Sequence, residues 1–178
     1  MGVLSSKQIR NLTEGPQTLL SDYVNLDEQL QPNGVDLTLG SIAKPITSGR
    51  IGIDNSQRVL SELEELNFDE SGYLNLPQGV YIARLNETVA LPENLMAIAK
   101  PRSSLLRNGV AVNNAVWDAG YVGKSQVQIV VHHPEGFVVS QNARIIQMVF
   151  MTLDESAEFL YSGQYQGEAT SESKESSK

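Results

Sequence analysis

The chain is dominated by short apolar runs that Gly, Pro and Asn interrupt at close intervals. Runs of about four to eight residues between such turn residues predict β-strands. Many short strands without alternating helices favour an all-β sandwich or barrel over a parallel α/β sheet. The pattern predicts strands over residues 35–39, 79–85, 95–99, 110–112, 125–132, 136–139 and 145–152.

Two segments carry a helical pattern instead. Residues 5–14 begin with Ser5 or Ser6, which can cap a helix, and end at Gly15. Residues 56–66 place four apolar side chains at helical spacing, with three glutamates between them. We therefore expect a mainly β protein with a short N-terminal helix and one helix inserted between strands.

Composition narrows the possible functions. The 178 residues suit one globular domain, expected over 1–167, and the polar stretch 168–178 is expected to be disordered. The net charge of −8 disfavours a nucleic-acid polymer as partner, and no apolar run is long enough to span a membrane. The absence of cysteine excludes disulfides and thiolate chemistry. The first ten residues lack the apolar core of a secretory signal, and with no cysteine in the chain a reducing cytoplasm is the expected compartment.

A cluster of cations and hydroxyls follows the strand predicted at 95–99. It contains Arg102, Ser103, Ser104 and Arg107. Guanidinium groups with hydroxyl and backbone donors are the groups that bind phosphate, because they neutralise charge and supply directed hydrogen bonds. The alternative interpretation is a solvated turn in which a serine caps a short helix.

The segment 113–123 joins two predicted strands and contains a carboxylate, two aromatic residues and two glycines. Backbone amides in such a hairpin can bind the edge of a base, and Tyr121 can stack on a sugar. Asp118 can act as a general base toward water. A plain β-hairpin with no catalytic role is an equally good interpretation.

Two further segments contain polar side chains of interest. Gln147 lies among apolar neighbours in the strand 145–152 and needs hydrogen-bond partners if it is buried. Tyr165 and Gln166 lie between glycines in 163–167, a segment that can close over a ligand or simply fray.

The order of these motifs along the chain is more specific than any one of them. The motifs read QPNGVDLTLG, PRSSLLRNGV, WDAGYVG, ARIIQMVF and GQYQG, in that order. This series resembles the superfamily of trimeric dUTP diphosphatases and dCTP deaminases. The resemblance implies a distorted β-barrel or jelly-roll-like subunit, and a homotrimer whose active sites lie at subunit interfaces.

The resemblance also implies a role for each site residue. Asp118 and Gln147 match the catalytic positions. Mg²⁺ is expected to be held mainly by the substrate's phosphates, and Asp36 matches an aspartate tied either to the hydration of the metal or to structure. Gln164 stands where a lysine often contacts phosphate. The residues expected to bind substrate are Arg102, Ser103, Ser104, Arg107, Asn114, Ala115, Tyr121, Gln128, Tyr165 and Gln166.

One position separates the activities within the superfamily. Deaminases that this chain resembles carry a proton-transferring glutamate ten residues after the hairpin aspartate, where this chain has Gln128. A neutral amide does not accept and return a proton near neutral pH. The resemblance therefore favours hydrolysis of dUTP to dUMP and pyrophosphate, with Asp118 activating the water. The alternatives are a dCTP deaminase and a non-catalytic trimeric nucleotide-binding protein.

Overall fold

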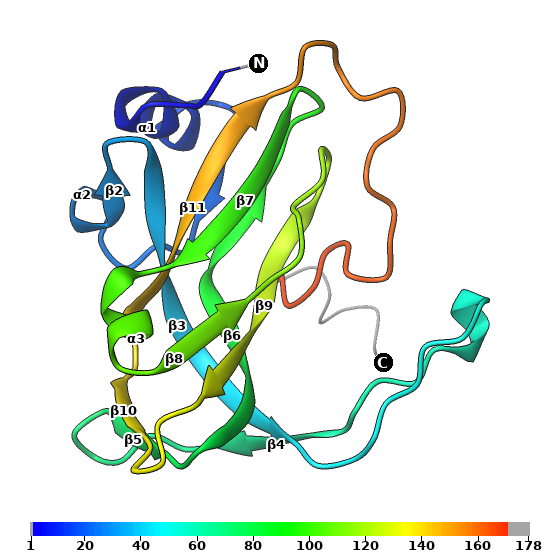
Figure 1. The fold of residues 1–178 in the computed structure, drawn as a ribbon. Coiled ribbons are helices and arrows are strands. Elements are labelled where there is room, and N and C mark those ends of the chain that lie inside the picture. Colours follow the sequence, from blue (N-terminus) through cyan, green and yellow to red (C-terminus); the bar gives the residue numbers. More distant parts are fainter. Residues whose placement is uncertain (1, 171–178) are drawn as a thin grey trace.

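A computed structural model describes residues 2–170 of the chain. Nine strands form one antiparallel sheet whose central path runs β7-β11-β3-β6-β9-β8. Figure 1 shows these strands curving around a shared interior, which gives the barrel-like subunit expected from the sequence. The strands on the path are β7 (Leu95–Pro101), β11 (Arg144–Thr152), β3 (Gly34–Pro45), β6 (Gly79–Ala90), β9 (Val122–Val131) and β8 (Val110–Asn113).

Short strands complete the architecture. In the large sheet, β1 (Leu20–Ser21) pairs with β6, while β2 (Leu30–Gln31) and β4 (Leu63–Leu66) pair with β3. A separate two-stranded sheet joins β5 (Tyr73–Leu76) to β10 (Phe137–Ser140). Each of the seven predicted strands overlaps an observed one, so the strand predictions are confirmed.

The core fills the inside of the curved sheet. Alternate residues of β6 and β9 point inward, as the two-residue period of a strand requires. Leu37, Ile129 and Phe150 are almost fully buried. Burial of each such side chain contributes about 1.5–3 kcal/mol to folding.

The N-terminal helix is confirmed as α1 (Ser6–Glu14). The Ser5 side chain accepts from the backbone N–H of Gln8, and the Gln8 side chain accepts from the N–H of Ser5, which forms a capping box. Ile9 is fully buried and attaches the helix to the sheet. A second short helix, α2 (Leu26–Gln29), begins after the cap residue Asn25.

The predicted helix over 56–66 is wrong. This segment holds a single 3₁₀ turn, η1 (Asn55–Gln57), followed by β4 along the far part of β3. β3 is twelve residues long and offers unpaired backbone groups to β4, and pairing with them outweighs the helical spacing of the leucines. Residues 46–62, here called the arm, form an extended hairpin that projects from the barrel in Figure 1.

The C-terminal segment lies against the barrel as far as it is described. Glu168 forms a parallel bridge with Gly123 of β9, and residues 171–178 of the predicted tail lie outside the described residues. Within residues 2–170, no helix has the length and hydropathy needed to cross a membrane.

Candidate functional site

A pocket of about 600 Å³ opens beside the β8–β9 hairpin. The hairpin loop, the outward face of β9, the base of the arm and the C-terminal segment enclose it. The structure brings five predicted site residues together at this pocket: Ala115, Asp118, Tyr121, Gln128 and Tyr165.

The hairpin loop is held in place by the strand next to it. Trp117 exchanges two backbone hydrogen bonds of 3.0 Å with Ala97 of β7. Gly120 has a φ of +83° and donates its N–H to Leu91 O, so the loop turns through a conformation that favours glycine. These contacts leave the side chain of Asp118 exposed at the pocket.

Tyr121 is buried behind the loop in a small polar cluster. Its hydroxyl lies 3.1 Å from Ser125 Oγ, which also accepts a hydrogen bond of 2.6 Å from Trp117 Nε1. The Tyr121 ring packs edge-on against Tyr161, with centroids 5.6 Å apart. Burial raises the pKa of the Tyr121 hydroxyl, so this group stays protonated. Its stacking on a sugar stays a prediction.

The C-terminal segment is fastened over the hairpin. Gln166 accepts from Val122 N–H at 3.0 Å and donates to Gly120 O at 2.9 Å. Gly167 N–H donates to Val122 O. Gln166 therefore anchors the segment through its amide, while Tyr165 lines the pocket. Substrate contact by either residue stays a prediction.

Several pocket residues were not anticipated. Glu168 lines the pocket, and burial raises the pKa of its carboxyl group against the opposing influence of Arg84. Pro45, Leu60 and Leu63 line it from the arm and its base. No sequence signal indicated these residues, because contacts between distant segments leave no local pattern.

The predicted phosphate cluster lies elsewhere on the subunit. Helix α3 (Ser103–Arg107) follows β7 directly and has Arg102 as its N-cap residue. Arg107 donates to Ser103 Oγ at 3.3 Å, and both serines are exposed. In Figure 1, α3 lies at the left edge of the molecule, whereas the arm and the C-terminal segment lie on the right.

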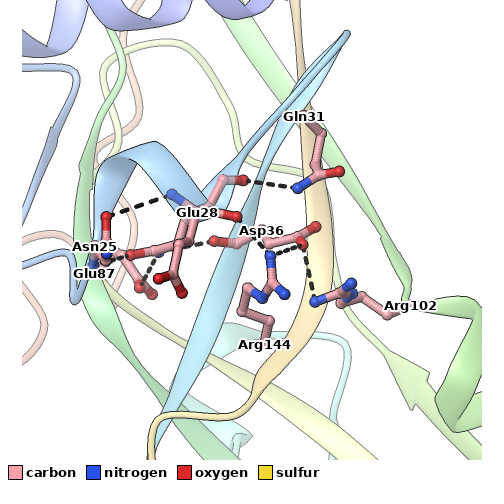
Figure 2. Close-up of polar contacts among 8 residues, drawn as sticks. Asn25, Glu28, Gln31, Asp36, Glu87, Arg102 and Arg144 are labelled. Carbon is pink, nitrogen blue, oxygen red and sulfur yellow. Dashed lines mark hydrogen bonds and ion pairs between the residues drawn. The ribbon is translucent and has the colours of Figure 1, made fainter.

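A buried carboxylate holds this cluster to the sheet. Figure 2 shows Asp36 between Arg102 and Arg144, at 3.1 Å and 3.6 Å. Burial raises the pKa of the Asp36 carboxyl group, and the two guanidinium groups oppose that shift. Gln147 pairs with Asp36 across the β3–β11 ladder, so it belongs to this cluster and not to the pocket. A role of Asp36 in the hydration of Mg²⁺ stays a prediction.

Behind Asp36 lies a buried polar network. Gln29 Nε2 donates to Asp36 O at 2.8 Å and to Glu87 Oε1 at 2.7 Å. Glu87 also accepts from the Thr38 hydroxyl at 2.6 Å and from the Thr38 N–H at 2.9 Å. Burial raises the pKa of the Glu87 carboxyl group although these hydrogen bonds oppose the shift. The network fixes the segment of β3 that carries Asp36.

In a single copy of the chain, the predicted catalytic residues Asp118 and Gln147 do not line the same pocket. Asp118 lines the pocket, while Gln147, Arg102, Ser103 and Arg107 do not. In the described part of the chain, no residue lining the pocket is a lysine or an arginine.

The barrel-like sheet, the aromatic-lined pocket at a β-hairpin and the separate helix with arginine and serine belong to one mainly β fold. A family model described as dCTP deaminase-like matches residues 3–153. The chain belongs to the dCTP deaminase-like family.

Curated relatives match almost the whole chain. A protein of Archaeoglobus fulgidus named "probable deoxyuridine 5′-triphosphate nucleotidohydrolase" is 51% identical over 94% of this chain and 98% of its own length. A protein of Methanosarcina mazei with the same name is 45% identical over 96% and 99%. A crystal structure of 2′-deoxycytidine 5′-triphosphate deaminase from Agrobacterium tumefaciens superposes with a TM-score of 0.66 at 32% identity. That match covers 84% of this chain and 48% of the deaminase chain, about half its length.

Proposed function

We propose that this protein hydrolyses dUTP to dUMP and pyrophosphate as a homotrimer. The observation that carries the proposal is the division of site residues within one subunit. Among the described residues, Asp118, Tyr121 and Gln128 line the pocket but no lysine or arginine does, whereas Arg102 and Arg107 lie at α3, outside it. One nucleotide needs both the pocket and the cations, because its base requires a shaped pocket and its triphosphate requires charge neutralisation. The names of the archaeal relatives support dUTP as the substrate.

The active site is then composed of two subunits. The pocket of one subunit binds uracil and deoxyribose, with the hairpin amides near Asn114 and Ala115 at the base and Tyr121 beside the sugar. The cluster of Arg102, Ser103, Ser104 and Arg107 from a neighbouring subunit binds the phosphates. Closed cyclic symmetry gives each of three sites the same composition.

The chemical step is attack of water on the α-phosphorus. Asp118 accepts the proton of the water, and the amide of Gln147 orients the water from the neighbouring subunit. The bond to the departing pyrophosphate breaks as the bond to the water oxygen forms. Arg102 and Arg107 stabilise the charge that develops on the phosphate oxygens.

Mg²⁺ fits this site as a companion of the phosphates. Among residues 2–170, no group of three or more His, Cys, Asp or Glu side chains forms a protein cage for a metal. Mg²⁺ commonly keeps several waters and binds through substrate phosphates, which requires few protein ligands. When bound, the ion neutralises phosphate charge.

Deamination of dCTP needs a proton-transferring group where Gln128 stands. The discriminating assay measures pyrophosphate and ammonia from dUTP, dCTP, dTTP and UTP with Mg²⁺ present. We expect pyrophosphate from dUTP and no ammonia from dCTP. Ammonia released at an enzyme-like rate refutes the proposal, and dUTP binding without any turnover indicates a nucleotide-binding protein instead.

Asp118→Asn tests the assigned base. We expect kcat to fall about 10²–10⁴-fold, the usual contribution of general-base catalysis. Asp27→Asn is the matched control, since Asp27 is an exposed carboxylate that pairs with Arg10 outside the pocket. Parental activity of Asp118→Asn shows that another group is the base.

Mixed trimers test the shared site. Asp118→Asn and Arg102→Ala are each expected to be inactive, and the two are unfolded and refolded together. If each site takes its pocket from one subunit and its cations from the next, random mixing restores about one quarter of the sites in a cyclic trimer. No recovery of activity places the whole site within one subunit.

A further inference from the structure

Gln128 lines the pocket with the orientation of its side-chain amide fixed by a neighbour. Asn113 ends β8 and pairs directly with Gln128 of β9. Asn113 Nδ2 donates a hydrogen bond of 3.0 Å to Gln128 Oε1. The pair lies where the β8–β9 hairpin opens into the loop that carries Asp118.

This contact determines which end of the Gln128 amide is available to a ligand. A carboxamide has an oxygen that accepts and a nitrogen that donates. Because Asn113 donates to Oε1, the Nε2 end of the Gln128 amide is the one we expect to face a ligand in the pocket. The pocket therefore offers a hydrogen-bond donor at this position.

We propose that Asn113 is a positioning residue that makes the pocket select pyrimidines with an oxygen, not an amino group, at position 4. The inference rests on the proposed function, in which the pocket holds the base. A 4-oxo pyrimidine presents an acceptor to Gln128 Nε2, whereas a 4-amino pyrimidine presents another donor. Two opposed donors leave both groups without a partner in a partly desolvated site, and discrimination of roughly ten- to a hundredfold follows.

Changing Asn113 to aspartate reverses the direction of the hydrogen bond between residues 113 and 128. A carboxylate accepts only, so the Gln128 amide turns to donate Nε2 to it and presents Oε1 to the ligand. Asn113→Asp is then expected to lower the preference for dUTP over dCTP at least tenfold. Asn113→Ala removes the constraint without supplying a new one, so we expect its preference to lie between those of the parent and Asn113→Asp.

The measurement is inhibitor binding, which does not depend on turnover. Dissociation constants of α,β-imido-dUTP and α,β-imido-dCTP are determined for the parent and both variants, and the ratio of the two constants is compared. The added negative charge acts on both ligands alike and cancels in the ratio. Asn94→Asp, which introduces the same charge at an exposed turn away from the pocket, is the matched control and is expected to keep the parental ratio.

The outcomes separate the inference from the proposed function. A ratio shifted toward dCTP in Asn113→Asp, with Asn113→Ala between the two, supports the inference whether or not the parent releases pyrophosphate from dUTP. A parental ratio in both variants overturns it, even if dUTP hydrolysis is observed. Because Asn113 is exposed, both variants are expected to fold, and an unchanged circular dichroism spectrum verifies this.

Discussion

Replacement of Glu87 by alanine is expected to destabilise the fold strongly. Glu87 is fully buried and accepts from the Thr38 N–H and from Gln29 Nε2. The Thr38 hydroxyl can rotate to another partner, but the two N–H donors are fixed and lose their acceptor. Each buried donor left without a partner costs about 1–3 kcal/mol, so the free energy of unfolding falls by about 2–6 kcal/mol.

Urea denaturation followed by circular dichroism measures this loss. With an m-value of about 2 kcal/mol/M, the midpoint falls by about 1–3 M. Protein concentration is held constant, since assembly contributes to apparent stability. Glu64→Ala, on the exposed strand β4, is the control and is expected to change stability by less than about 0.5 kcal/mol. A midpoint for Glu87→Ala equal to that of the control would show that the network contributes no stability.

Three further predictions test other parts of the structure. Because burial raises the pKa of Glu87, the folded state binds a proton on this carboxyl group more tightly than the unfolded state does. The free energy of unfolding therefore falls as pH rises above about 4.5. Glu87→Gln flattens this dependence on pH, as urea titrations at several pH values measure. Arg58 of the arm donates to Gln164 Oε1 of the C-terminal segment at 2.8 Å, and this bond joins two segments beside the pocket. Arg58→Met and Gln164→Ala each break it, so each is expected to speed release of α,β-imido-dUTP by about two- to tenfold. The double variant is expected to release the ligand no faster than either single variant. Gly120→Ala lowers the free energy of unfolding, measured by urea denaturation, by about 1–3 kcal/mol, because φ is +83° and a Cβ atom would lie 2.6 Å from Leu160 Cβ.

The strands and the first helix were predictable because their signals are local. A capping box marks the start of α1, and period-two alternation marks β6 and β9. The segment 56–66 misled the prediction because spacing reports which residues share a face, not what that face packs against. Val59 and Leu60 stay largely exposed, so the helix would have had no core to bury.

The sequence motifs pointed to some of the residues that line the pocket but not to how distant segments enclose it. Motif order placed Asp118 and Tyr121 at one loop and Arg102 at another, and both placements agree with the structure. The part played by Glu168 and the fixed amide of Gln128 depend on contacts between segments far apart in sequence or across strands. These contacts depend on the register in which the strands pair. That register is set by the hydrophobic pattern of the whole core and not by a short motif.

The charges of the pocket provide a physical reason for the assembly that we propose. Asp118 and Glu168 are the charged residues that line it, and both are carboxylates. Alone, they repel a triphosphate, and the net charge of −8 adds to this repulsion over the whole chain. Arg102, fixed by Asp36 at 3.1 Å, is positioned before any ligand arrives. In the proposed homotrimer, a neighbouring subunit would bring this preset cation to the pocket and supply the missing attraction, so the proposed site would be complete only in the oligomer.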